Sequence, residues 1–277
     1  MTDAVAMNVG FVGGGNMARS LVGGLVARGH DRAAIAVAEP QAALREALAH
    51  DFGVACGEDN AAVAARSDVV VLAVKPQVMK SVCAALAPAL AVRRPLVLSI
   101  AAGVRIAQFE RWLGREQPVV RAMPNTPALI GAGVSGLIAN AAASTAQRDA
   151  ARYVLEAAGR AVFIDDEALM DVVTAVSGSG PAYFFLLIEA LEAAAVARGL
   201  PPEVARTLTI ETAFGAARMA RESGDPPAAL RERVTSPGGT TAAALECFAA
   251  GGLRELVDRA VERATVRGAE LSAALGE

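Results

Sequence analysis

Histidine, cysteine and lysine are scarce in this 277-residue chain. The 2 histidines, His30 and His50, each lie beside an aspartate just beyond an apolar helical pattern, which is typical of helix ends and not of catalysts. A Ser-His-Asp or Cys-His enzyme needs a histidine next to its nucleophile, and a zinc site needs ligands that the chain hardly contains. The chain therefore has to take most of its chemistry from a bound cofactor, and we expect no metal site.

The three cysteines, Cys56, Cys83 and Cys247, are odd in number and share no metal-type or redox-type spacing. We interpret them as small buried residues in a reducing compartment. The formal net charge of −3 and the pI near 5.6 leave no basic footprint for nucleic acid or anionic lipid. The start of the chain also has no basic segment followed by an apolar one. We therefore expect a cytoplasmic protein that binds neither nucleic acid nor a membrane.

The first 165 residues alternate between two apolar patterns. Short β-branched runs, typical of strands, alternate with alanine-rich helical patterns, and this order predicts a mainly parallel sheet with helices on both faces. The expected strands are residues 9–12, 35–38, 69–74, 96–100, 119–121, 134–139 and 161–164. Residues 1–165 are thus predicted to form a doubly wound α/β domain.

After Asp166 the strand signal disappears, and residues 166–277 are predicted to form a second, all-α domain. Residues 182–197 are apolar around more than one helical face, although Glu189 and Glu192 interrupt them. About 110 residues of helix offer little interior for such a surface, so we expect oligomerisation through this domain. Glycines and prolines separate the expected helices, which are residues 167–176, 181–198, 202–222, 226–234, 240–249 and the stretch from 252 onward.

A glycine-rich turn joins the first expected strand to an apolar helix. The pattern Gly13-x-Gly15-x-x-Ala18 matches the dinucleotide fingerprint. Its first glycine permits a tight turn, its second lets the backbone approach a pyrophosphate, and its small third residue allows close packing of helix on strand. We therefore predict that NADH or NADPH binds at Gly13, Gly14, Gly15, Asn16, Met17 and Ala18.

An acidic residue, Glu39, ends the second expected strand. A carboxylate at this point hydrogen-bonds the ribose hydroxyls of NAD and repels the extra phosphate of NADP. Arg45 follows closely and is long enough to turn toward such a phosphate. The sequence favours NADH and leaves the use of both cofactors open.

Three further loops follow strand ends, where ligands of open parallel sheets lie. Lys75 is one of few charges in an apolar run, which makes it a candidate catalytic residue and a candidate contact for ribose or substrate. A solvated loop lysine is the alternative interpretation. Two prolines fix a later loop, which includes Met123 and Pro124 and presents Asn125 to the nicotinamide amide. The other residues expected to line the cofactor are Ala73, Val74, Pro76, Gln77, Ile100, Ala101 and Ala102.

Two uncharged segments of the second domain are rich in glycine and hydroxyl groups, and each precedes an expected helix. Free N–H groups and hydroxyls at a helix start can hold a substrate carboxylate without a cationic side chain. Capping loops with no ligand are the alternative interpretation. The segments contain Ser177, Gly178 and Ser179 in one case and Ser236, Gly238, Gly239, Thr240 and Thr241 in the other.

The glycine turn and segments 73–77, 121–127, 177–183 and 235–241 together resemble pyrroline-5-carboxylate reductase, in order, over essentially the whole chain. The last two motifs are specific to that family, whereas the first is shared by all Rossmann enzymes. The resemblance implies a Rossmann-type domain followed by a helical dimerisation domain. It also implies NAD(P)H-dependent reduction of L-1-pyrroline-5-carboxylate to L-proline, the last step of proline biosynthesis, by interlocked homodimers that often form decamers and share each active site between two subunits.

By position, the resemblance implies that Asn60 meets the adenosine part of the cofactor. It implies that Ser236, Thr240 and Thr241 hold the substrate carboxylate and ring, with Glu167 near the ring nitrogen. Thr241 is our candidate hydrogen-bond partner or proton relay at that nitrogen, and solvent is the alternative proton source.

Two other classes fit parts of the pattern. Another imine reductase or a β-hydroxyacid dehydrogenase would keep the fold, but the hydroxyacid enzymes use a lysine in the first long helix of the second domain. The only lysines here are Lys75 and Lys80, which argues against them. A non-catalytic dinucleotide-sensing dimer would bind the cofactor without turnover and would leave the two hydroxyl-rich segments without a role.

Overall fold

The computed structural model describes residues 7–275, which divide into two compact units. The sheet unit comprises the chain through Ser179 together with the segment from Ala264 onward, and the helical unit is Gly180–Arg263. Two parts of the chain lie outside the described residues. They are residues 1–6, which belong to the start of the chain discussed above, and residues 276–277, the end of the expected C-terminal helix. The predicted domain boundary after Asp165 stays a prediction. In the division into compact units, residues 166–179, which follow that boundary in sequence, belong to the sheet unit.

One eight-stranded sheet forms the centre of the sheet unit, in the order β3-β2-β1-β4-β5-β6-β7-β8. Neighbouring strands are parallel except β6 and β7, so the mainly parallel sheet is confirmed. The strand order reverses between β1 and β4, and open α/β sheets bind ligands at such a switch point. The strands are β1 (Val9–Val12), β2 (Ile35–Ala38), β3 (Ala55–Gly57), β4 (Val69–Leu72), β5 (Leu96–Ser99), β6 (Val119–Met123), β7 (Gly133–Ala139) and β8 (Gly159–Phe163).

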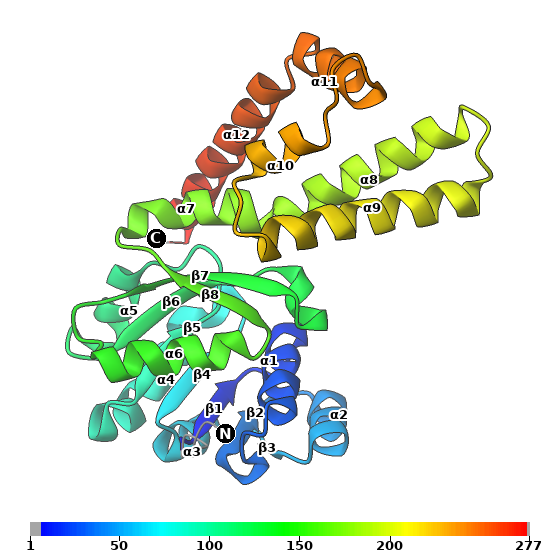
Figure 1. Cartoon of the computed structure of the whole chain (residues 1–277). Helices are drawn as coiled ribbons and strands as arrows, with labels where there is room; N and C mark the ends of the chain where they lie inside the picture. The colour runs from blue at the N-terminus through cyan, green and yellow to red at the C-terminus, as the bar shows by residue number, and fades with distance from the viewer. Residues whose placement is uncertain (1–6, 276–277) are drawn as a thin grey trace. The chain divides into compact units, whose positions relative to one another are not determined.

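Helices cover both faces of this sheet (Figure 1). Side chains alternate along β1, so that Val9 and Phe11 join one apolar cluster and Val12 joins the other. Both clusters are fully buried at their centres, and the predicted doubly wound architecture is confirmed. The first cluster includes α1 (Asn16–Ala27), α2 (Ala42–Phe52) and α6 (Thr145–Glu156), and the second includes α3 (Asn60–Arg66), α4 (Pro76–Arg93) and α5 (Ile106–Leu113).

Short helical segments complete the sheet unit. One turn, η1 (Arg32–Ala34), precedes β2, and another, η2 (Thr126–Ile130), joins β6 to β7. After β8 the chain forms η3 (Glu167–Leu169), α7 (Met170–Val173) and the π-helical η4 (Thr174–Gly178). These three segments run directly into the first helix of the helical unit.

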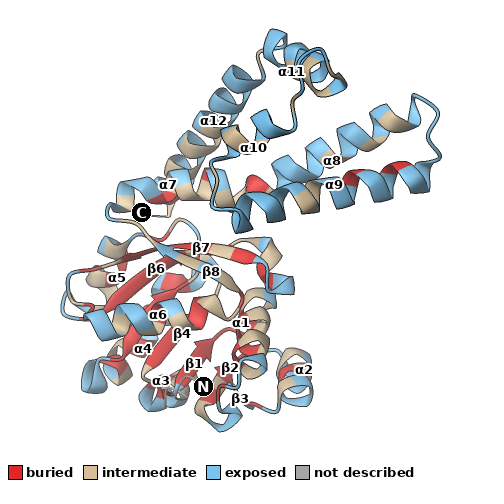
Figure 2. Cartoon of the chain, viewed as in Figure 1, coloured by how far each residue is buried: buried red, intermediate tan, exposed pale blue. Residues whose placement is uncertain are grey.

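The helical unit contains no sheet and has almost no interior of its own. Within residues 180–263, Gly180, Ala205 and Thr209 are the buried residues, and Figure 2 shows how few red segments its helices carry. Its helices lie close to the expected bounds and are α8 (Gly180–Val196), α9 (Pro202–Glu222), α10 (Pro227–Arg233), α11 (Thr240–Ala250) and α12 (Leu253–Ala274), the last part of which belongs to the sheet unit.

One helical stretch of the described chain, Glu167–Val196, is long and apolar enough, by length and composition, to cross a membrane. Helices that pack against other protein helices can have the same length and composition. In the single chain its exposed large side chains include Phe184 and Phe185, which are 66% and 64% exposed. A surface of this kind needs a covering partner in water.

The cysteines differ in burial. Cys83 is buried in the second cluster, and burial raises the pKa of its thiol to about 12. Cys56 is half-buried, and burial raises the pKa of its thiol as well. Cys247 on α11 is exposed, so the expectation that all three are buried is wrong for Cys247. The reason is that α11 belongs to the unit with almost no interior.

Candidate active site

The glycine turn between β1 and α1 has a backbone that favours glycine. Gly13 has a φ of +98°, and a Cβ at this position would lie 2.6 Å from the carbonyl oxygen of Ala73. The N–H of Gly13 donates to the carbonyl oxygen of Ala38 at 2.8 Å. The turn is therefore held against the ends of β2 and β4, and the predicted cofactor residues Ala73 and Val74 lie beside it.

Gly15 is the N-cap of α1 and leaves open space in front of the helix. A Cβ on Gly15 would meet no atom within 4 Å. No side chain caps the free N–H groups of this described turn, and the turn carries no acidic residue. Free N–H groups at the positive end of a helix dipole bind anions. The residues present thus fit a dinucleotide pyrophosphate at the predicted place.

Glu39 follows β2 and is only 6% exposed. Its Oε2 accepts a hydrogen bond from the N–H of Gly14 at 2.8 Å, and its Oε1 accepts one from the N–H of Gln41 at 2.9 Å. The carboxylate therefore ties the glycine turn to the loop after β2. Each oxygen keeps a second lone pair that can accept a ribose hydroxyl.

Other predicted cofactor residues lie at the same edge of the sheet, because the carboxyl ends of parallel strands share an edge. Lys75 is exposed and directly precedes α4, whose first residues are Pro76 and Gln77. Asn60 is the first residue of α3, after the capping Asp59. The segment that follows β5 carries Ile100, Ala101 and Ala102.

Two predicted segments meet within the sheet unit. The side-chain N–H₂ of Asn125 donates to the carbonyl oxygen of Ser177 at 3.1 Å, and its Oδ1 accepts from the N–H of Val134 at 2.9 Å. A Cβ on Gly178 would lie 2.7 Å from Cε of Met123, so these two residues are in close contact. Asn125 therefore bridges the loop after β6, the start of β7 and the π-helical turn. Its predicted contact with nicotinamide stays a prediction.

The segment around Ser177 is not the loop that the sequence suggested. The chain is helical through it, with a π turn in which the N–H of Ser179 donates to the carbonyl oxygen of Thr174 at 2.8 Å. The hydroxyl of Ser177 donates to the carbonyl oxygen of Val173 at 2.9 Å. The expectation of a free helix start here is wrong, because apolar residues on both sides favour one continuous helix.

The second hydroxyl-rich segment, in the helical unit, does form a turn before a helix. The N–H of Gly239 donates to the carbonyl oxygen of Ser236 at 3.0 Å, and Gly238 has a φ of +68°. Gly239 is the N-cap of α11, and no side-chain hydrogen bond caps this described helix. Thr240 and Thr241 form its first turn. This arrangement suits a carboxylate, and the predicted binding of the substrate here stays a prediction.

Comparisons with known proteins agree across both units. The chain is 53% identical over 269 residues to a pyrroline-5-carboxylate reductase of Pseudomonas aeruginosa, covering 97% of this chain and 98% of the relative. This chain belongs to the pyrroline-5-carboxylate reductase family. Residues 167–271 match the family model "Pyrroline-5-carboxylate reductase dimerisation", and residues 8–103 match "NADP oxidoreductase coenzyme F420-dependent".

Solved structures agree with this membership. A pyrroline-5-carboxylate reductase from Coxiella burnetii superposes with a TM-score of 0.94 at 43% identity, over 96% of this chain and 98% of that one. The Plasmodium falciparum enzyme, solved with NADP bound, superposes with a TM-score of 0.82 at 29% identity and the same coverage. The expected fold, a Rossmann-type sheet followed by a helical dimerisation region, is confirmed.

Sequence reasoning assigned no role to Arg121, which lies in the middle of β6 and is only 3% exposed. Its guanidinium contacts Oε1 of Glu167 at 2.9 Å, and the same oxygen accepts the N–H of Ile106 at 2.9 Å. Glu167 thus links β6 to the start of α5 in the sheet unit. The signal in the sequence was a single charged residue inside an apolar strand, because such a residue needs a partner when buried.

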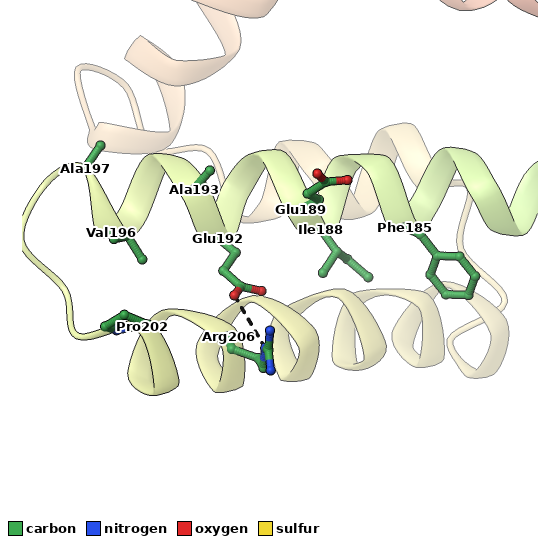
Figure 3. Close-up of a pocket in the computed structure, with 9 residues that line it drawn as sticks. All are labelled: Phe185, Ile188, Glu189, Glu192, Ala193, Val196, Ala197, Pro202 and Arg206. Carbon is green, nitrogen blue, oxygen red and sulfur yellow. Dashed lines mark ion pairs between the residues drawn. The ribbon is translucent and has the colours of Figure 1, made fainter.

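The helical unit has an open groove of about 640 Å³ between α8 and α9 (Figure 3). Phe185 and Ile188 form part of its wall, and Glu192 on α8 pairs with Arg206 on α9 at 3.4 Å. The charge of Glu192, which interrupts the apolar run, is thus balanced inside the unit. The match of this region to a dimerisation family explains why so much apolar surface is left open in one chain.

Proposed function

We propose that this protein reduces L-1-pyrroline-5-carboxylate to L-proline with NADH or NADPH, as the last step of proline biosynthesis. The observation that carries this proposal is the 53% identity, over 97% of the chain, to a pyrroline-5-carboxylate reductase. The open glycine turn supports the cofactor, and the uncapped start of α11 supports a substrate with a carboxylate.

The cofactor residues are proposed from the geometry of the sheet unit. When bound, NAD(P)H supplies a hydride to the carbon of the substrate C=N bond. The free N–H groups behind Gly15 hold the pyrophosphate, and Glu39 accepts ribose hydroxyls. Asn60, Lys75 and the segments after β4, β5 and β6 bind along the rest of the dinucleotide.

The substrate residues are proposed from the helical unit and from the π-helical segment. Ser236, Gly238, Gly239 and Thr240 bind the carboxylate, and the Thr241 hydroxyl hydrogen-bonds the ring nitrogen. Protonation of that nitrogen makes the adjacent carbon more electrophilic. Fixing the two reactants in a near-attack geometry is worth about 7 to 11 kcal/mol, so no strong acid is required.

Two other proposed roles fall in the π-helical segment and just before it. Ser177, Gly178 and Ser179 contact the substrate, and Glu167 lies near its ring nitrogen. Both segments belong to the sheet unit, and their proposed role is to position the substrate. Neither role involves proton transfer in this proposal.

We also propose the assembly and location. The apolar helical unit forms a homodimer, and such dimers assemble further into a decamer. The open groove between α8 and α9 supports the dimer, since an identical subunit is apolar in the same places. We place the protein in the cytoplasm, with a small-molecule substrate and no nucleic-acid or membrane partner.

The direct test is oxidation of NADH and of NADPH by the purified protein when racemic pyrroline-5-carboxylate is added. We expect loss of the reduced-nicotinamide absorbance, with proline as the product. If either cofactor binds but neither is oxidised, the substrate assignment fails and only dinucleotide binding remains.

Replacing the Thr241 hydroxyl tests the proposed contact at nitrogen. Thr241→Ala should lower kcat about 10²-fold if the hydroxyl relays the proton. Thr241→Ser keeps the hydroxyl and should retain most activity. Thr240→Ala is the neighbouring control, and it should raise KM more than it lowers kcat because the carboxylate is held in the ground state as well. An unchanged kcat in Thr241→Ala would remove Thr241 from the mechanism.

A further inference from the structure

Arg45 lies against the turn that follows β2. Its Nη1 donates to the carbonyl oxygens of Glu39 at 2.7 Å and of Pro40 at 2.8 Å. Two backbone acceptors therefore fix the guanidinium at the carboxyl end of β2. In dinucleotide-binding folds a 2′-phosphate on the adenosine ribose lies near this strand end, where an arginine can accommodate it.

The charge of Arg45 is already balanced in this chain. Its Nη2 lies 2.6 Å from Oε1 of Glu58, which follows β3 on the neighbouring strand. The Arg45 side chain is 19% exposed, whereas that of Glu58 is 70% exposed. Glu39, buried with its carboxylate on the glycine turn, adds a second negative charge close by. The guanidinium is thus positioned for an anion but paired with one of the protein's own.

We propose that Glu58 is a specificity-determining residue: by occupying Arg45, it makes this protein prefer a cofactor with a free ribose 2′-hydroxyl over one with a 2′-phosphate. The proposal rests on the dinucleotide site of the proposed function and needs no assumption about the substrate. A phosphate entering next to Arg45 would have to displace Glu58 and would remain near its carboxylate. Like charges a few ångströms apart at a protein surface repel each other, which weakens binding of the phosphate.

The two acidic residues near Arg45, Glu39 and Glu58, have different roles. Glu39 is buried and ties two backbone segments together, so its replacement would disturb the glycine turn itself. Glu58 is exposed, and its carboxylate pairs with Arg45. Exposed ion pairs add little to folding stability, so Glu58 can be changed without loss of the fold.

The test is equilibrium binding to the whole protein, without substrate. Wild-type protein should bind NADH more tightly than NADPH in fluorescence titrations. Glu58→Gln should tighten NADPH binding about tenfold and change NADH binding by less than about twofold. Calorimetry with adenosine 2′,5′-bisphosphate against adenosine 5′-monophosphate should show the same selective gain. Added salt should weaken the gain, because it is electrostatic.

The matched control is Glu116→Gln, which removes a similarly exposed carboxylate paired with Arg94 at 2.6 Å. It should change neither affinity. Arg45→Met combined with Glu58→Gln should abolish the gain in NADPH affinity. The proposal is overturned if Glu58→Gln leaves the ratio of the two affinities unchanged or shifts it toward NADH. Because turnover is not measured, a failure here leaves the reductase activity standing, and a failure of the activity leaves this result standing.

Discussion

The sheet unit and the helical unit use the same apolar residue types with opposite results. In the sheet unit, Phe11 and Phe109 are fully buried at the centres of two clusters. In the helical unit, Phe184 and Phe185 are 66% and 64% exposed. Figure 2 shows the contrast in the buried strands and the exposed helices. The sheet unit has its own core, whereas the helical unit must obtain one from another subunit.

The cause lies in the pattern of each element. Strands of the sheet alternate between two layers of helices, so both faces of a strand are covered within the chain. In α8 the apolar residues surround the helix, and α9 covers only one side of it. A helix that is apolar on several sides is stable only when several partners cover it. Folding of the helical unit is therefore coupled to association.

Charging the exposed face of α8 should have the largest effect. The double substitution of Phe184→Glu and Phe185→Glu should convert the oligomer to monomer, measured by sedimentation, and abolish turnover. Each buried Phe side chain contributes about 1.5–3 kcal/mol, and a twofold interface contains each one twice, so we expect association to weaken roughly 10³-fold or more.

Val92 provides the matched control for that substitution. It is 83% exposed on α4 of the sheet unit, outside the helical unit. Val92→Glu should leave both the oligomer and the activity unchanged. An unaltered oligomer in the α8 variant would contradict the division into a self-sufficient unit and a dependent one.

Replacing one helical glycine with alanine in each unit should have a smaller effect on stability, and the sign of that effect should differ between the two units. In α1, a Cβ on Gly24 would lie 2.0 Å from the carbonyl oxygen of Ala157, so Gly24→Ala should destabilise the protein by about 1–3 kcal/mol. In α9, a Cβ on Gly215 would meet no atom within 4 Å, and Gly215→Ala should stabilise by up to about 1 kcal/mol. Denaturant unfolding measures both. A loss of stability in Gly215→Ala would mean that the assembled oligomer covers this face of α9.

The sequence predicted most of the fold because its patterns are long and regular. Seven of the strands were expected from β-branched runs, and the helices from periodicity and their glycine and proline boundaries. β3 (Ala55–Gly57) was missed because it has three residues, none of them β-branched, at an edge of the sheet. The close contact of Gly24 with Ala157 joins residues far apart in sequence, so no local sequence pattern predicts it.

The candidate site was predictable where one segment makes it. The glycine turn and the turn before α11 are local motifs, and both have the predicted form. The π turn at Thr174–Gly178 was not predictable, because it depends on hydrogen-bond register inside a continuous helix. The pairs of Arg121 with Glu167 and of Arg45 with Glu58 were not predictable either, since each joins two segments that only the folded sheet brings together.

Acid should weaken the sheet unit slightly through His30, the smallest effect that we predict. His30 is 5% exposed, its Nε2 lies 3.0 Å from the carbonyl oxygen of Met7, and its Nδ1 lies 3.1 Å from the hydroxyl of Tyr153. Desolvation by burial lowers the pKa of His30 below its ordinary value of 6.5, although the hydrogen bond to Met7 and the charge of Asp31 oppose the shift. Below pH 6.5 His30 is protonated more readily in the unfolded chain than in the folded chain. The contribution of neutral His30 to the free energy of unfolding is therefore fully present above pH 6.5 and is lost as the pH falls below this value. His30→Gln should remove that slope in unfolding measurements between about pH 8 and about pH 5, and at the upper end it should show only the constant cost of altered hydrogen bonds. An identical slope in the variant would assign the acid sensitivity to other groups and leave His30 as a neutral link between the start of β1 and α6.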